Sequence, residues 1–496
     1  MEILPDGHRG LEFTRIEELE GLVGFDRDIL IDFYLENIQP SYPLLTNRDV
    51  TYLSSSRSKL DPSLLAAVYS LAASSKSHSN QYLLPKLDEL TSGLLQESFI
   101  RPRLCSVQAA LIAAQCWSMN SSILTMQINA AAFDLGLHQD CSQWNISESH
   151  KSLRRRLAWA LYAHDKWTAF STGRPSLISP NNWAVRRLSP TDFEPPQSNV
   201  PTVELFSQYI TLSTLLSSVL DTFYTLASSS MVSPQQILGL AKPVQLQLKE
   251  WYSNLPACLK MDSSIINSGT DSPRPENHSS KPLAFLHLAY FTTEILLHRC
   301  IIRSLSPASV SSTPPSAYTP LHHICRLAAK TRLISSLDFC NRLRPEHISA
   351  FWPVGSRTQF ALIGSFGTLL LATSPTNEEE DFYSARLHEF RWTLGVCSSA
   401  AGEDRLGFSD ALDKLDLGVE LWQKGRELKG SRNRSVKDVA EEMKRTQPPG
   451  AMSLQQLPGS SLPTTRIRPE FADGVMDVDF ENGFNTDDES LEGSDD

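Results

Sequence analysis

Apolar residues recur along most of this chain at intervals of three and four residues, the spacing that places them on one face of an α-helix. Alternation of apolar and polar residues, which is typical of strands, is scarce. Clusters of glycine, proline and serine separate the apolar stretches as turns and loops do. Besides the two helices described next, the pattern predicts helices over residues 26–37, 63–77, 84–100, 105–119, 203–228, 233–252, 283–304, 322–341, 359–373, 384–396 and 411–429. An all-α fold follows.

The stretch over residues 126–187 joins two helical patterns through a turn. The first helix is predicted to end in the sequence Leu135-Gly136-Leu137-His138, because glycine readily takes the left-handed backbone conformation that closes a helix. The second helix has cap candidates in Ser147 and Ser149, and an apolar stripe along it faces a core. Gly173-Arg174-Pro175 ends this helix.

The order and spacing of these parts resemble the signature segment of the fungal transcription factor domain, the middle homology region of zinc-cluster regulators. Two differences are mild: Ala158 stands where the family often has a second tryptophan, and Lys166 where arginine is common. The sequence from Phe33 to Pro43 resembles the usual opening of this domain. The matching signature residues are Leu135, Gly136, Leu137, His138, Asp140, Arg154, Arg155, Arg156, Trp159, Tyr162, Asp165, Gly173, Arg174 and Pro175.

The pattern along the chain divides it into four segments, and the resemblance gives the bounds of the second. Residues 1–27 form an N-terminal lead-in segment with one short helical pattern, and residues 28–375 form the fungal-specific transcription factor domain, interrupted by Ser/Pro-rich loops. Residues 376–430 are expected to be outer helices, and residues 431–496 a disordered, acidic tail. The sequence from Phe360 to Glu379, taken with the opening near Phe33, also resembles zinc-cluster co-activators of nitrogen catabolism.

The charge of the chain is uneven. The net charge of −11 hides a tail from Glu470 to Asp496 with 11 acidic residues and no lysine or arginine. Outside this tail, 45 acidic residues face 45 basic ones. A neutral body lacks the basic footprint of a stand-alone nucleic-acid binder.

The acidic tail also carries apolar residues, which alternate with carboxylates. Acidic residues keep such a segment solvated and leave its apolar side chains available to the groove of a partner protein. This composition indicates an amphipathic activation region, and the alternative is a solvating tail with no binding role. The apolar residues are Val475, Met476, Val478, Phe480 and Phe484.

The eight cysteines argue against a zinc cluster within this sequence. A fungal zinc cluster needs six closely spaced thiolates, but the first cysteine is Cys105 and none belongs to a C-x-x-C pair. Buried, reduced thiols are the expected state. The missing module weakens the case for direct DNA contact.

The polar signature residues favour a structural interpretation over a chemical one. Three consecutive arginines, residues 154–156, spread around a helix and cannot form one contact face for DNA, so we expect ion pairs, with Asp165 and Glu148 as candidate partners. Arg174 is expected to bind Asp165 or helix carbonyls. The histidines lack the spacing of metal ligands, and no catalytic or nucleotide-binding motif is found. No enzyme, metal or cofactor is predicted.

These observations, with the resemblance, predict a nuclear regulator of RNA polymerase II transcription that acts mainly through protein contacts. Its expected partners are DNA-bound transcription factors and the transcription machinery, without a membrane span. A weak basic segment over residues 432–445 is a candidate nuclear import signal. Two alternatives stay open: a gene model that lacks an upstream zinc cluster, and a ligand-sensing helical domain whose pocket is lined by helices 283–303 and 359–373. Target genes and oligomeric state, whether homo- or hetero-oligomer, are not determined.

Overall fold

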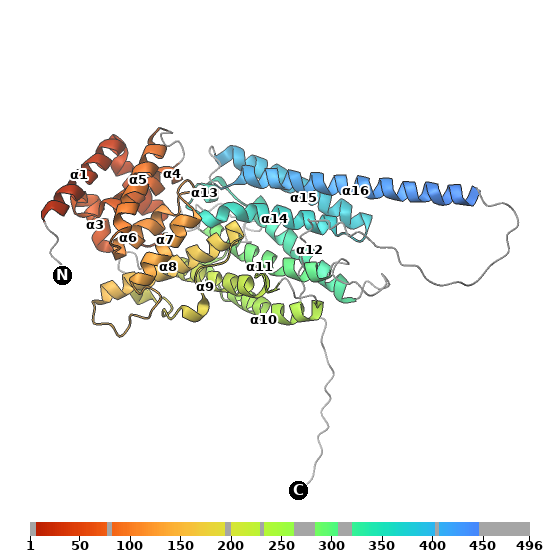
Figure 1. The fold of residues 1–496 in the computed structure, drawn as a ribbon, viewed down its shortest axis with the longest axis horizontal. Helices are drawn as coiled ribbons and strands as arrows, with labels where there is room; N and C mark the ends of the chain where they lie inside the picture. The colour runs from red at the N-terminus through yellow and green to blue at the C-terminus, as the bar shows by residue number, and fades with distance from the viewer. Residues whose placement is uncertain are drawn as a thin grey trace, which may run out of the picture.

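A computed structural model describes residues 6–76, 82–193, 200–228, 233–261, 283–305, 320–401 and 406–445 (Figure 1). Within these ranges the backbone forms helices joined by turns and contains no strand, which confirms the predicted all-α class. The longer helices are α1 (Asp6–Val23), α2 (Arg27–Phe33), α3 (Asn47–Ser55), α4 (Pro62–Ser75), α5 (Leu83–Phe99), α6 (Leu104–Ala113), α7 (Ser122–Asp134), α8 (Glu148–Thr172), α9 (Val200–Phe223), α10 (Pro234–Ser253), α11 (Ala284–Leu305), α12 (Pro320–Asn341), α14 (Arg357–Ala372), α15 (Asn377–Ala401) and α16 (Phe408–Arg445). A short helix, α13 (Pro345–Ile348), precedes α14.

The buried apolar side chains form two clusters. The N-terminal core lies among α1 to α7, the first part of α8 and one side of α9, and includes Tyr69, Leu111 and Ile128. The C-terminal core lies among α9 to α16 and includes Phe285 and Phe366. The ribbon follows the same division, with the red and orange helices at one end and the green and blue helices at the other (Figure 1).

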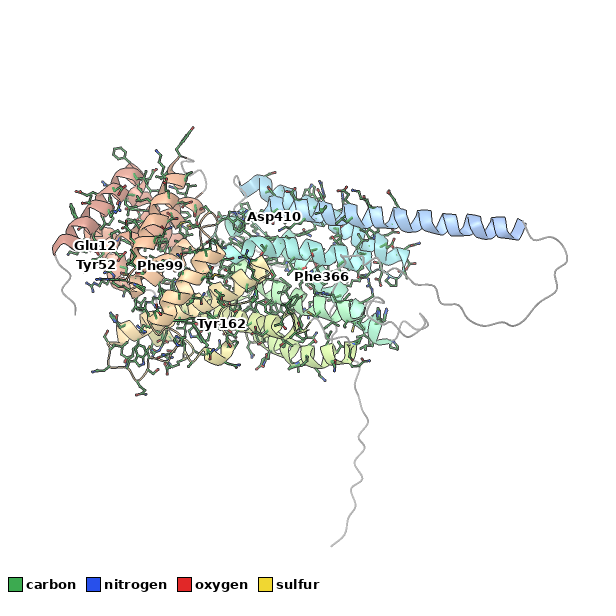
Figure 2. The ribbon with its side chains drawn as sticks, viewed as in Figure 1. Glu12, Tyr52, Phe99, Tyr162, Phe366 and Asp410 are labelled. Carbon is green, nitrogen blue, oxygen red and sulfur yellow. The ribbon has the colours of Figure 1, made fainter. Side chains whose placement is uncertain are left out.

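Helix α8 contributes to both cores. Leu157 and Leu161 are fully buried in the N-terminal core, whereas Trp167, one and a half turns further along, is buried in the C-terminal core. Trp167 stacks on Tyr209 of α9 with ring centroids 6.0 Å apart and donates a hydrogen bond to Ser213 Oγ at 2.9 Å. Figure 2 shows Tyr162 of α8 between Phe99, at the N-terminal end, and Phe366. The stretch that the sequence pattern singled out therefore joins the two halves.

Local sequence signals set several helix ends as predicted. Asp61 caps α4 by accepting from the Ser63 amide, and Pro62 follows at the first helical position. Ser147 caps α8 by accepting from the His150 amide. Gly173 ends α8 in the left-handed conformation, with φ of 62°.

The structure differs from the sequence prediction near the N-terminus. Residues expected to be a loose lead-in segment form the 18-residue helix α1, and its Leu19 side chain is fully buried in the N-terminal core. Helix α3 was not predicted, although a capping box of Thr46 and Asp49 starts it. Helix α6 ends at Ala113, six residues before the predicted end, and Trp117 is 54% exposed.

The structure also differs near the C-terminus. The helices expected to lie outside the body pack into the C-terminal core, because α15 buries Tyr383, Leu387 and Phe390 against α14 and its neighbours. Helix α16 continues to Arg445, past the expected loss of order near Lys429, and extends beyond the other helices in Figure 1. The tail was predicted over residues 431–496; its first 15 residues belong to α16, and residues 446–496 lie outside the described residues.

One helix in the described ranges is long and apolar enough to cross a membrane by length and composition. This segment, Thr202–Phe223 of α9, has 61% of its most apolar window buried inside the fold, as the core helix of a globular domain has.

Replacement of Leu19 by alanine tests whether α1 belongs to the N-terminal core. Removing a fully buried leucine side chain should lower the free energy of unfolding by about 2–5 kcal/mol, because it leaves a cavity. Replacement of Phe13, which is 51% exposed on the same helix, should change stability by less than about 1 kcal/mol. Urea denaturation of the full chain measures both, and equal effects would show that α1 is not held by its buried face.

Candidate functional site

The signature turn between α7 and α8 has the predicted geometry. Gly136 takes a φ of 68°, its amide donates to the Phe133 carbonyl at 2.9 Å, and the Leu137 amide donates to the Ala132 carbonyl at 2.9 Å. A Cβ atom at Gly136 would also lie 3.2 Å from the Trp144 ring. Leu137 is buried, so the turn places an apolar side chain directly into the N-terminal core.

His138 and Asp140 hold the chain that follows this turn. The His138 carbonyl accepts a hydrogen bond from the Ala184 amide at 3.0 Å, and its ring meets the Phe133 ring edge-on at 5.2 Å. Asp140 accepts from the Ser142 amide at 3.1 Å and the Ser142 hydroxyl at 2.7 Å. These hydrogen bonds favour the carboxylate and lower the pKa of Asp140.

The three arginines of α8 bind three different parts of the protein. Arg154 lies over the Trp144 ring, 4.5 Å from its centroid, and donates to the Leu135 carbonyl. Arg156 has no exposed surface and donates from Nη1 to the Pro43 carbonyl at 2.6 Å and to the Leu45 carbonyl at 3.2 Å. Arg156 thus ties the domain opening to α8.

Arg155 belongs to a buried charge cluster that the sequence reasoning missed. Its guanidinium donates to Asp192 Oδ1 at 2.9 Å, and Asp192 also accepts two bonds from Arg186 at 2.9 Å. Asp192 is 1% exposed. The Ser189 to Asp192 capping box was the available sequence signal. The predicted partners of the arginines were wrong: Glu148 pairs with Lys151, and Asp165 binds elsewhere.

Asp165 fastens the turn that ends α8 back onto the helix. It accepts from the Leu177 amide at 2.9 Å, the Ile178 amide at 3.2 Å and the Ser176 hydroxyl at 2.5 Å. The neighbouring Lys166 donates to Ser176 Oγ and to the Ile178 carbonyl, and burial lowers its pKa although Asp165 opposes the shift.

The side chain of Arg174 was predicted to bind Asp165 or helix carbonyls and binds Ser122 instead, although its backbone amide donates to the Ala169 carbonyl at 3.1 Å. Its Nη1 donates to Ser122 Oγ, in the first turn of α7, at 2.5 Å. The side chain is exposed at the surface beside that helix.

The aromatic signature residues pack against the loop after α8. Trp159 lies 5.3 Å from the Tyr162 ring and 6.1 Å from the Trp183 ring, and its Nε1 donates to the Arg186 carbonyl at 2.8 Å. Arg187 covers the other side, 4.9 Å from the Trp159 centroid. The signature residues therefore hold α7, α8 and the following loop together as one unit.

Groups suited to metal binding are not assembled in the described ranges, where no three His, Cys, Asp or Glu residues gather around one point. Six cysteines are buried, as expected, whereas Cys105 is half-buried and Cys258 is exposed. Burial raises the pKa of the Cys116 thiol to about 12, so this thiol is protonated near neutral pH.

The two helices predicted to line a ligand pocket are largely buried. Helices α11 and α14 pack into the C-terminal core, where Leu286 and Ile363 have no exposed surface. A cavity of about 280 Å³ lies instead where the two cores meet, beside Trp117, Phe351 and Arg357.

Comparison with known proteins identifies the domain. Residues 31–253 match the fungal specific transcription factor domain, and the chain carries this domain, as the signature residues predicted. It is 34% identical over 456 residues to transcriptional activator protein DAL81 of Saccharomyces cerevisiae, covering 81% of this chain and 45% of that protein.

Other relatives have names of the same kind. The chain is 25% identical over 343 residues to cutinase transcription factor 1 alpha of Fusarium vanettenii, covering 64% of this chain and 36% of that protein. It is 32% identical over 194 residues to transcriptional activator protein acu-15 of Neurospora crassa, covering 37% of this chain and 19% of that protein. The chain spans less than half the length of each of these relatives.

Replacement of Arg156 by alanine should lower the free energy of unfolding by about 3–5 kcal/mol, because buried carbonyls lose their donor. Replacement of Arg391 by alanine is the control, since this arginine is 55% exposed and solvent screens its ion pair with Asp416, so the loss of stability should be much smaller. Urea denaturation compares the two variants. A loss no larger for Arg156 than for Arg391 would contradict the role given to Arg156.

Stability should depend on pH through His164, which contacts Thr125 Oγ1 at 3.1 Å. Burial lowers the pKa of His164 from 6.5 to about 4. Between these values the unfolded chain binds a proton at this ring and the folded chain does not. Lowering the pH through this window should therefore reduce the free energy of unfolding, by up to about 1.4 kcal/mol per pH unit.

Replacement of His164 by glutamine should make this decline shallower between pH 6.5 and 4.5 and leave the slope above pH 7 unchanged. The matched control is the replacement of His150, an exposed histidine at the start of the same helix, by glutamine. Denaturation at a series of pH values measures the slopes. If the free energy of unfolding falls with pH in the same way for wild type and the His164 variant, His164 is not the group responsible for the decline.

Proposed function

We propose that this chain regulates transcription by RNA polymerase II in the nucleus, mainly through contacts with other proteins. A DNA-bound transcription factor recruits it, and the acidic segment over residues 470–496 engages the transcription machinery. The observation that carries the proposal is the fungal specific transcription factor domain over residues 31–253, together with similarity to named transcriptional activators. The proposed role is not catalytic.

Charge and contacts support the recruited mode of action. The body outside residues 470–496 has as many acidic as basic residues, so it offers little general attraction for a polyanion. Within α8, Arg155 and Arg156 are 5% and 0% exposed and bind protein groups. These arginines are therefore occupied inside the fold and are not available to phosphates.

A second candidate is a regulator that binds DNA through a zinc-cluster module in a longer product of the same gene. The greater length of the relatives favours it, since the chain spans 45% of DAL81. The genomic sequence upstream of the Met1 codon separates the two candidates: six closely spaced cysteine codons in the same transcript would replace the recruited mode with direct DNA binding.

A tethering assay in a fungal host tests the proposal. The full chain, with and without residues 470–496, is fused to an unrelated DNA-binding module and scored on a reporter gene. Activation by the full chain that falls at least about tenfold without the acidic segment is expected, because that segment carries the apolar and acidic residues that a partner groove would bind. Immunoblots and microscopy confirm equal nuclear amounts of both fusions.

The matched control for charge replaces Phe480 and Phe484 by alanine and keeps every carboxylate of the segment. It should also lose activation, because the apolar side chains supply the contact area. Equal activation by all fusions, or no activation by the full-chain fusion, would show that residues 470–496 are not the activating segment.

A further inference from the structure

Helix α7 has an apolar face that stays partly exposed in the described structure. Ile123 is 71% exposed, Met126 52% and Phe133 36%, and Ala130 is also exposed. Their spacing of three, four and three residues places them along one side of the helix. We call these four residues the outer face of α7.

The opposite side of α7 is already buried. Leu124, Ile128 and Ala132 pack in the N-terminal core. A helix that is apolar on all sides is normally enclosed on all sides, whereas a surface helix has a polar outer face. The outer face of α7 is therefore an apolar surface without a described partner, the kind of surface that marks an interaction site.

The N-terminal end of this face is positively charged. Arg174 is exposed and donates a hydrogen bond to Ser122 Oγ in the first turn of α7. The positive end of the α7 helix dipole lies at the same place. The one acidic residue of α7 itself is Asp134, at the other end.

A cavity lies beside the same end of the helix. Trp117, which is 54% exposed, forms one wall, and Phe351 and Trp352 form another, around a volume of about 280 Å³. Partner proteins commonly insert one large apolar side chain into such a cavity, and this anchor dominates the binding energy.

From these features we propose that the outer face of α7 docks a short amphipathic helix of another protein. The apolar side of that helix lies along Ile123, Met126 and Phe133, and its acidic residues meet Arg174. The apolar stripe and the positive end match this class of partner in shape and charge. The inference rests on the proposed function, in which the helix belongs to the DNA-bound factor that recruits this chain.

Fluorescence anisotropy tests the docking directly. The probe is a labelled synthetic helix of about 18 residues with leucines along one side and glutamates beside them, and a sister peptide carries lysines in place of the glutamates. The full wild-type chain should bind the glutamate peptide at least about tenfold more tightly than the lysine peptide.

Two variants locate the site. Ile123→Ser combined with Met126→Ser should weaken binding of the glutamate peptide at least about tenfold. The matched control combines Leu240→Ser with Leu246→Ser, which replaces two side chains, 42% and 57% exposed, on α10, and should leave binding unchanged. Arg174→Glu should weaken the glutamate peptide and strengthen the lysine peptide. Circular dichroism melts verify that every variant folds.

Several outcomes overturn the docking proposal. The first is that the α7 and α10 variants weaken peptide binding equally, and the second is that wild type binds both peptides equally well. The third is that the glutamate peptide does not bind at concentrations up to about 100 μM, because an affinity below this limit is too weak for transient recognition. Self-association of the full chain that the α7 variant abolishes would assign the face to a second copy instead. Analytical ultracentrifugation measures this.

The reporter assay separates this inference from the proposed function. Fused to the unrelated DNA-binding module, the Ile123→Ser, Met126→Ser chain should activate as well as wild type, because tethering bypasses recruitment. Loss of activation in that fusion would overturn the recruitment role of α7. If the wild-type fusion does not activate, the proposed function is contradicted, whereas the peptide-binding result still holds.

Discussion

The burial of α8 between two apolar clusters is the constraint on which the rest of the fold depends. Leu157 and Leu161 complete the N-terminal core, and Trp167 completes the C-terminal core through Tyr209 and Ser213 of α9. Helix α9 also contributes to both cores, with Phe206 in the N-terminal core and Tyr209 in the C-terminal core. The two halves are therefore packed together through α8 and α9.

The charged residues of α8 stabilise its position and are enclosed by the protein. Arg156 binds backbone carbonyls near residue 43, Arg155 binds Asp192, and Asp165 binds amides after the helix end. A buried charge is tolerated only where hydrogen bonds replace water, and each of these groups has them. A motif rich in arginine in a transcription factor suggests nucleic acid, but here its role is to join three chain segments that are distant in sequence.

The proposed contacts with partners lie at different places on the chain. The outer face of α7 belongs to the N-terminal half, whereas α16 extends from the C-terminal half and leads toward the acidic segment (Figure 1). A recruited regulator needs this separation, because a surface engaged with one protein must leave its effector segment accessible to another.

The sequence by itself determined the helical class, most helix positions, and the ends at Ser147, Gly136 and Gly173, because these depend on periodicity and on residues within a few positions of each other. It did not reveal α1 or the burial of α15, since their polar composition hides a narrow apolar face that only packing defines. Only the tertiary structure decided that Arg155 pairs with Asp192, 37 residues away, and not with nearer carboxylates. It also decided that the outer face of α7 stays exposed. Which distant residues pair depends on the angles at which the helices pack. The local sequence pattern does not specify these angles.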